Sequence, residues 1–182
     1  MCGFVFAYAK SGLGLPDQAR LDLMDSAIRH RGPDEHGQKL LDRAVMGHRR
    51  LAIIDITGGQ QPMCSPDGQV WIVFNGEIYN FIAVRDELAA AGHPLKTNSD
   101  TEVLLHAWLV WGEKCLDRLN GMFAFAIYDG RTQSMFAARD RFGEKPLYVT
   151  EKDGVLYLAS DASTFTTGSA MLVDGGVSVN RT

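Results

Sequence analysis

Residues 121–160 read GMFAFAIYDGRTQSMFAARDRFGEKPLYVTEKDGVLYLAS. Short apolar runs alternate here with turn residues, and the pairs Asp129-Gly130 and Asp153-Gly154 are typical of tight turns between neighbouring strands. The apolar runs that predict strands are residues 123–128, 135–138, 147–150 and 155–159. Because strands joined by such short turns pair antiparallel, this part of the chain predicts an antiparallel sheet.

The preceding part of the chain adds more strands together with amphipathic helices. Runs rich in Val, Ile, Phe and Trp predict strands at residues 3–9, 44–56 and 69–75. Apolar side chains at helical spacing predict helices at residues 17–30, 78–91 and 101–112. Ser99, followed three residues later by Glu102, forms a capping-box pattern at the start of the last helix. Strands joined by short turns, with helices to cover their outer faces, indicate a layered α+β sandwich rather than a doubly wound parallel sheet.

The composition excludes several classes of protein. A chain of 182 residues with 46% apolar and 22% charged residues suits one globular domain. Its net charge of -4 gives no field that would gather nucleic acid or an anionic membrane surface. No apolar run approaches the roughly 18 residues of a membrane span, and the N-terminus lacks a signal-peptide pattern. We therefore expect a cytoplasmic protein with neither nucleic-acid nor membrane partners.

The cysteines and histidines show no metal-ligand spacing. Cys2, Cys64 and Cys115 are widely separated and form no C-x-x-C pair, so we expect neither a disulfide framework nor a zinc site. The five histidines also lack a pattern such as H-x-x-x-H. No metal site is expected, and at least one thiol is expected to be free.

Cys2 would carry its thiol and a free α-amino group on one carbon once Met1 is removed. An α-amino group titrates around pH 7.7, so near neutral pH a fraction of it can accept the thiol proton, directly or through water. Since the thiolate is the reactive form of cysteine, Cys2 is a candidate nucleophile that requires no histidine. The alternative is a cysteine that stands at position 2 by chance.

Further polar residues could complete a site around this thiol. Asn75 and Gly76 place an amide side chain beside a flexible backbone N–H, a pair that could bind a developing oxyanion; an ordinary Asn-Gly turn is the alternative. Arg50 lies in an apolar strand, where its guanidinium needs a carboxylate partner, unless it points to solvent at the strand end. Glu77 and Asp100 could hold an ammonium group, or they could be a loop charge and a helix-dipole acid.

Seven segments together resemble the class II glutamine amidotransferase domain of glutamine-dependent asparagine synthetases. They occur in the order of that family: Cys2-Gly3, RHRGPD at 29–34, HRRLAIID at 48–55, FNGEIYN at 74–80, SDTE at 99–102, GMFAFA at 121–126 and RDRFGEKPLY at 139–148. The resemblance implies an N-terminal-nucleophile hydrolase fold, a four-layer αββα sandwich of two antiparallel sheets, for a domain of residues 1–160.

The resemblance also implies a role for each matching position. Cys2 is expected to be the nucleophile, with its own amino group as the base, and Asn75 and Gly76 are expected to form the oxyanion hole. Arg50 would hold the α-carboxylate of glutamine. The remaining positions expected around the substrate are Glu77 and Asp100 at the α-amino group and, as backbone contacts, Ile53 and Ile54.

The implied reaction is attack of the Cys2 thiolate on the side-chain amide of glutamine, which releases ammonia, followed by hydrolysis of the thioester to glutamate. Glutamine would be the substrate, and no cofactor is expected in this chain. ATP and magnesium are expected only for a synthetase domain, which this sequence lacks and to which the ammonia would pass. A homodimer is compatible with the sequence. The segment at 139–148 lies near the inter-domain boundary in that family, although it could equally be a structural hairpin.

Residues 161–182 depart from this family. They resemble the C-terminal tail of short-chain dehydrogenases, so we interpret them as an atypical tail of foreign or chimeric origin. The glycine-rich fingerprint G-x-G-x-x-G is absent, since Gly12 and Gly14 are followed by Asp17, and no NAD site is expected. Two alternatives to an active asparagine-synthetase-type glutaminase stay open: a non-catalytic truncated remnant, and the glutaminase domain of another class II amidotransferase.

Overall fold

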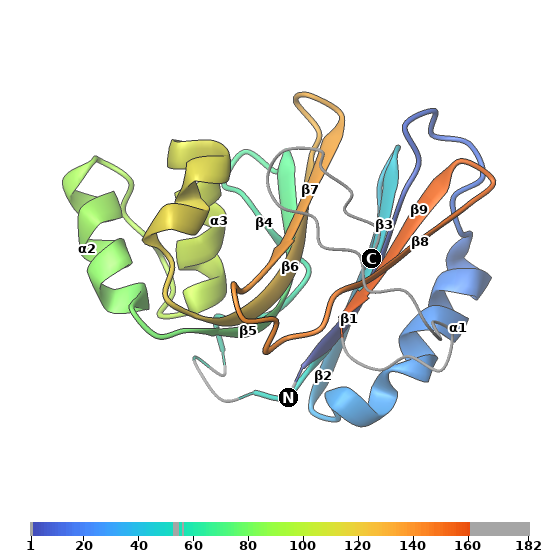
Figure 1. Cartoon of the computed structure of the whole chain (residues 1–182), viewed down its shortest axis with the longest axis horizontal. Coiled ribbons are helices and arrows are strands. Elements are labelled where there is room, and N and C mark those ends of the chain that lie inside the picture. Colours follow the sequence, from blue (N-terminus) through green and yellow to red (C-terminus); the bar gives the residue numbers. More distant parts are fainter. Residues whose placement is uncertain (1, 53–54, 56, 161–182) are drawn as a thin grey trace.

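Two antiparallel sheets pack face to face in the computed structural model, which describes residues 2–52, 55 and 57–160 (Figure 1). The first sheet has the order β2 (Glu35–Leu40), β3 (Ala44–Arg50), β1 (Gly3–Tyr8), β9 (Val155–Ser160) and β8 (Tyr148–Lys152). The second has the order β4 (Met63–Cys64), β5 (Val70–Ile78), β6 (Gly121–Asp129) and β7 (Ser134–Arg139). All strand pairs are antiparallel, as the sequence predicted.

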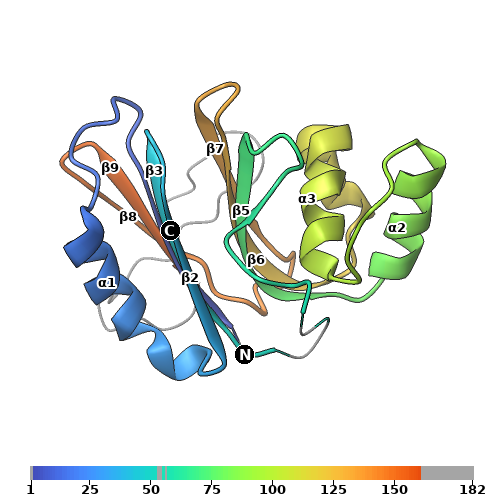
Figure 2. The same ribbon diagram turned by 180° about the vertical axis from the view of Figure 1, so that it is seen from behind.

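Helices cover the outer face of each sheet. Helix α1 (Gln18–Ala27), followed by a 3-10 turn at Arg29–Arg31, lies on the outer side of the first sheet (Figures 1 and 2). On the other side, α3 (Asp100–Trp111) lies against the second sheet, α2 (Phe81–Ala90) packs on α3, and a 3-10 helix at Gly112–Arg118 follows α3. The four layers confirm the predicted αββα sandwich. Among the described residues, no helix combines the length and the apolar character needed to cross a membrane.

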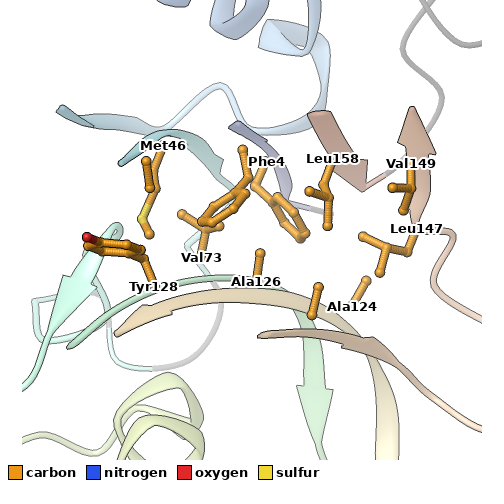
Figure 3. Close-up of a cluster of buried hydrophobic side chains, with 12 residues drawn as sticks. Phe4, Met46, Val73, Ala124, Ala126, Tyr128, Leu147, Val149 and Leu158 are labelled. Atoms are coloured by element: carbon orange, nitrogen blue, oxygen red, sulfur yellow. The ribbon is translucent and has the colours of Figure 1, made fainter. Parts of the chain in front are cut away.

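The main core lies between the two sheets (Figure 3). Side chains alternate between the faces of a strand, and on β1 Phe4 and Phe6 point into this core while Val5 and Ala7 pack toward α1. The same holds in the second sheet, where Val73 faces the first sheet and its neighbours on β5 pack toward α3. Both faces of each sheet are therefore covered, which explains why the strands read as apolar runs rather than as alternating patterns.

Several predicted boundaries were wrong. The strand predicted at residues 44–56 ends at Arg50. The strand predicted to end at Asn75 continues to Ile78, because its ladder with β6 extends to the pair Ile78 and Gly121. The second helix accordingly begins at Phe81 rather than at Ile78.

The sequence also missed two edge strands. Strand β2 has the polar sequence EHGQKL, and within the described part of the chain it pairs with β3 alone, so it carries little of the apolar signal that marks a buried strand. Strand β4 contains two residues, which is too short for any periodicity.

The capping-box prediction was half right. Ser99 is the N-cap of α3 and its side chain accepts a hydrogen bond from the N–H of Thr101. The carboxylate of Glu102 does not close the box, because it accepts the backbone N–H groups of Lys96 and Thr97 instead. The N–H of Ser99 donates to the hydroxyl of Thr97. This bond within the loop before the helix replaces the one that Glu102 would accept in a capping box.

Candidate active site

The candidate site lies at one end of the core between the sheets. Phe4, Met46, Val73 and Leu158 contribute to this core from four different strands. A polar residue lies two positions from each of them; it precedes Phe4 and follows the other three. Positions two apart share a face of a strand, so these polar residues also face the space between the sheets. They are Cys2, His48, Asn75 and Ser160, and Arg50 continues the row of His48.

One pocket brings together the residues that the sequence predicted to act together. Its lining includes Cys2, Arg50, Asn75, Gly76, Glu77 and Asp100. These residues come from the N-terminus, the end of β3, the end of β5 and the first turn of α3. The predicted positions Ile53 and Ile54 lie outside the described residues.

The thiol of Cys2 is half-buried at the start of β1. The backbone N–H of Leu51 donates to its Sγ at 3.4 Å, and the Sγ lies 3.6 Å from the carbonyl oxygen of the same residue. Burial raises the pKa of the Cys2 thiol, although the Leu51 hydrogen bond and the charge of Arg50 act in the opposite direction. The thiol is therefore mostly protonated on its own, and its conversion to thiolate requires a base within reach.

Arg50 is buried, with 5% of its surface exposed, so the solvent-facing alternative is wrong. Its Nη1 donates to Oε2 of Glu35 at 2.8 Å, and its Nη2 donates to the carbonyl of Asp55 at 2.6 Å. Glu35 is the carboxylate partner that an arginine in an apolar strand requires, and it stands directly opposite Arg50 in the ladder of β2 and β3. The neighbouring Arg49 forms an ion pair with the buried Asp25 of α1 at 2.5 Å.

Asn75 and Gly76 do not form a turn. Both are strand residues of β5, paired with Ala124 and Phe123 of β6. A Cβ atom at position 76 would lie 2.2 Å from the carbonyl oxygen of Met122, so a glycine is required because β6 approaches too closely for any side chain. The turn alternative of the sequence is therefore wrong.

The backbone N–H of Gly76 points to the pocket side of β5. In an antiparallel strand the N–H and C=O of alternate residues point to the same edge. The N–H of Phe74 meets the side chain of Gln61 at 2.6 Å, and the N–H of Ile78 meets Oδ2 of Asp100 at 3.1 Å, both on the edge away from β6. Gly76 lies between these two residues and shares their edge, where β4 has already ended.

Two carboxylates, Glu77 and Asp100, complete the pocket lining. Burial raises the pKa of Asp100 to about 6, and the charge of Glu77 adds to this effect. The hydrogen bond from Ile78 favours the ionised form but does not outweigh burial. A cation that bound here would relieve the repulsion between the two groups, which makes this corner of the pocket suited to an ammonium group.

The sequence missed Gln61, which reinforces the strand before Asn75. Its carboxamide accepts the N–H of Phe74 at 2.6 Å and donates to the carbonyl of Phe74 at 3.1 Å. The register of β4 pairs Met63 with Ile72, so Gln61 lies opposite Phe74, and its side chain takes the place of a backbone peptide. No pattern in the sequence indicates such a bond.

His48 supports the same carbonyl from the first sheet. Its Nε2 lies 3.0 Å from the oxygen of Phe74, and because a carbonyl only accepts, Nε2 must carry the proton. The ring is fully buried, and burial lowers its pKa to about 4. His48 is therefore neutral near pH 7 and acts as a hydrogen-bond donor between the sheets. Its position two residues from Met46 on an apolar face is the signal that could have found it.

The segment at 139–148 contains a carboxylate-centred loop. Asp140 is buried, and its carboxylate accepts the backbone N–H groups of Phe123, Phe142, Glu144 and Lys145 at 2.9–3.1 Å. These bonds fix the loop between β7 and β8. The two strands belong to different sheets, so the segment crosses between the sheets and the hairpin alternative is wrong. Its place near an inter-domain boundary stays a prediction.

With this geometry in place, comparison with known proteins identifies the family. A family model described as a glutamine amidotransferase domain matches residues 1–176. The chain belongs to the glutamine amidotransferase domain family. This confirms the resemblance that the sequence motifs indicated.

The relatives of this amidotransferase domain are longer proteins. It is 45% identical to "Asparagine synthetase [glutamine-hydrolyzing] 1" of Bacillus subtilis over 163 residues, which cover 88% of this chain and 26% of that protein. It is 38% identical to "Asparagine synthetase [glutamine-hydrolyzing] 3" of Arabidopsis thaliana over 162 residues, which cover 88% of this chain and 28% of that protein. The chain thus spans about a quarter of the length of the relatives it matches.

A solved structure supports the fold independently of these sequences. A glutamine phosphoribosylpyrophosphate amidotransferase from B. subtilis, complexed with ADP and GMP, superimposes with a TM-score of 0.64 at 21% identity. The match covers 87% of this chain and 41% of that chain. The predicted boundary at residue 160 and the foreign origin of the tail stay predictions, and residues 161–182 lie outside the described residues.

Proposed function

We propose that this domain hydrolyses glutamine to glutamate and ammonia, with Cys2 as the nucleophile. The observation that carries the proposal is the convergence on one pocket of a thiol, a guanidinium, two carboxylates and two amide donors. These groups match the parts of glutamine: a carbonyl to be attacked, an α-carboxylate and an α-ammonium.

Recognition of the substrate falls to the charged side chains. The guanidinium of Arg50 binds the α-carboxylate, while Glu77 and Asp100 bind the α-ammonium group. With both charged ends held, the side-chain amide of glutamine reaches toward Cys2. A substrate that lacks either charged group would lose one of these anchors, so we expect the domain to prefer the free amino acid.

Catalysis begins with transfer of the thiol proton of Cys2 to its own α-amino group, after removal of Met1. The Sγ then attacks the carbonyl carbon of the amide. The oxyanion that forms accepts hydrogen bonds from the side chain of Asn75 and the backbone N–H of Gly76; loss of one such donor costs about 3 kcal/mol in a well-studied protease. Collapse of this intermediate breaks the carbon–nitrogen bond, and the nitrogen leaves as ammonia after it takes up the proton. Water then hydrolyses the thioester to glutamate and restores the thiol.

We further propose that the domain serves an asparagine synthetase. Relatives at 38–45% identity are named as glutamine-hydrolysing asparagine synthetases, and this chain corresponds to only 26–28% of their length. The ammonia would then be consumed in a synthetase domain, which would also be the part that binds ATP and magnesium. The proposed setting is the cytoplasm, where a free thiol stays reduced.

The test measures release of glutamate and ammonia from glutamine by the purified chain, after mass spectrometry has verified that Met1 is removed. Cys2→Ala should abolish release. Cys64→Ala is the matched control, because Cys64 is an exposed free cysteine outside the pocket lining, and it should retain full activity. Tight binding of glutamine without turnover by the processed wild-type chain would contradict the proposal and favour a non-catalytic remnant.

A further inference from the structure

We propose that Ser160 is a positioning residue of the oxyanion site, which acts by fixing the orientation of the Asn75 carboxamide. This inference rests on the proposed function, since it deepens the role given there to Asn75. Asn75 Nδ2 donates to Ser160 Oγ at 2.8 Å, and Ser160 Oγ donates to the carbonyl oxygen of Pro146 at 3.0 Å. The two hydrogen bonds connect Pro146, through Ser160, to Asn75 in the pocket lining.

The bond between Asn75 and Ser160 joins the two sheets inside the protein. Asn75 lies near the end of β5 in the second sheet, and Ser160 is the last residue of β9 in the first. Both are buried, with 1% and 0% of their surfaces exposed. A hydrogen bond in such a place is shielded from water, so each partner depends on the other to satisfy its polar atoms.

The acceptor at Pro146 determines which atom donates in each of these two hydrogen bonds. A carbonyl oxygen can only accept, so the hydroxyl proton of Ser160 is committed to Pro146. The Oγ therefore presents its lone pairs to Asn75, and only the nitrogen of the carboxamide can donate to them. A flipped carboxamide would set Oδ1 against Oγ, two acceptors face to face, with the loss of a buried hydrogen bond.

One N–H of the Asn75 amide is thus held by Ser160, and the amide plane is fixed. An amide nitrogen carries two hydrogens, and the second is left for the pocket that Asn75 lines. Without Ser160 the carboxamide could turn its oxygen toward the substrate, where it would repel a developing oxyanion. Ser160 therefore keeps the donor, rather than the acceptor, of Asn75 in the oxyanion site.

The loop at 139–148 gains a role from this chain of bonds. The carboxylate of Asp140 fixes the backbone of residues 142–145, and the last of its bonds is to Lys145, immediately before Pro146. The acceptor for Ser160 is therefore held in place by Asp140. The loop thus supports Asn75 indirectly, through the hydrogen bonds of Pro146 and Ser160.

The test is a double-mutant cycle with Ser160→Ala and Asn75→Ala, in which kcat and KM for glutamine are measured. Ser160→Ala should lower kcat about tenfold and leave KM within about twofold, because the lost interaction matters only in the transition state. Asn75→Ala should lower kcat by about 10²–10³. The double variant should be no slower than Asn75→Ala, since Ser160 acts only through Asn75.

Two controls separate positioning from loss of stability. Ser65→Ala removes another buried serine, which binds the backbone of Val70 away from the pocket, and it should leave kcat unchanged even if the melting temperature falls. Ser160→Thr keeps the hydroxyl and should restore most of the kcat lost in Ser160→Ala. If the added methyl group prevents folding, exchange of the Asn75 side-chain amide protons provides the second readout: exchange should be slow in the wild type and fast in Ser160→Ala.

The outcomes distinguish this inference from the proposed function. A wild-type kcat in Ser160→Ala, or a double variant slower than Asn75→Ala by the full Ser160→Ala factor, would overturn the positioning role while Asn75 keeps its own. A wild-type kcat in Asn75→Ala would overturn the proposed oxyanion site and the inference with it. Slow amide exchange that persists in Ser160→Ala would show that other contacts orient Asn75.

Discussion

Asp100 is expected to couple substrate binding to pH. Burial raises its pKa to about 6, so in the free protein its carboxylate is ionised at pH 7 and becomes neutral as the pH falls through 6. A neutral Asp100 no longer attracts an ammonium group. We predict that the affinity of the Cys2→Ala variant for glutamine is constant from pH 8 to 7 and falls about tenfold for each pH unit well below 6. Calorimetric titration with glutamine checks this without interference from turnover.

Two variants locate the source of this pH dependence. In the Cys2→Ala background, Asp100→Asn should weaken binding at pH 8 and remove the dependence near pH 6. Glu77→Gln should keep the dependence but move its midpoint to lower pH, because the charge of Glu77 raises the pKa of Asp100. A profile that is flat from pH 8 to 5 with Asp100 present would contradict the role assigned to this residue.

At the scale of the element, the end of β5 is held by a side chain that substitutes for a strand. Gln61 satisfies both the N–H and the C=O of Phe74 where β4 has ended. Gln61→Met keeps the length of the side chain but leaves the buried N–H of Phe74 without its partner, while the carbonyl of Phe74 keeps its bond from His48. We predict a loss of about 1–3 kcal/mol in the free energy of unfolding, measured by urea denaturation, together with a lower kcat, because Asn75 follows Phe74 directly.

The matched control for this element is Gln69→Met. Gln69 is exposed in the turn before β5, so its replacement should change stability by less than about 0.5 kcal/mol and leave kcat unchanged. Equal stabilities for the two glutamine variants would show that the Gln61 carboxamide does not support the strand.

The elements that the sequence predicted correctly are those whose signal is local. The pairs Asp129-Gly130 and Asp153-Gly154 lie in the β6–β7 and β8–β9 turns, and α3 follows its Ser99 cap within one residue of the prediction. Strand β2 was missed because it contributes to the fold through its ladder with β3 and through the bond of Glu35 to Arg50. Neither contribution produces an apolar pattern in the sequence.

The chemical groups of the site could be predicted because each follows from its residue type. A thiol, a guanidinium and paired carboxylates can be named from the sequence. The resemblance of the motifs to a known family assigned them to one site before the fold was described. Contacts between the sheets could not be predicted in this way. Asn75 and Ser160 are 85 positions apart in the chain, and only the packing of β5 across from β9 shows that they meet.

For the whole molecule, the sandwich places polar groups at one end of an apolar core. The same alternation that buries Phe4, Met46 and Val73 brings polar side chains of the same rows to the pocket lining, namely Cys2, Arg50 and Asn75. The groups are rigid because they stand on paired strands, and they are desolvated because two sheets close over them. Desolvation raises the pKa of Asp100 and lowers the pKa of His48, so the stability of the fold must itself depend on pH.

His48 and Asp100 should make this dependence visible with opposite signs. Burial lowers the pKa of His48 from 6.5 to about 4, so the unfolded chain binds its proton first, and this contribution to stability is lost as the pH falls from 6.5 to 4. Burial raises the pKa of Asp100 from 3.8 to about 6, so the folded state binds its proton first, and this contribution grows as the pH falls from 6 to 3.8. Each shift corresponds to roughly 3 kcal/mol, so the two largely cancel in the wild-type protein.

Single variants remove one of the two contributions and expose the other. His48→Gln keeps a donor for the carbonyl of Phe74 but does not titrate, so the wild type should lose about 2–3 kcal/mol relative to this variant between pH 7 and pH 4.5. Relative to Asp100→Asn, the wild type should instead gain stability over the same interval. Urea denaturation at the two pH values measures both differences. Burial disfavours the charged form of each group, so it lowers the pKa of a histidine and raises the pKa of an aspartate. Two differences of the same sign would therefore show that burial does not govern the titration of these groups.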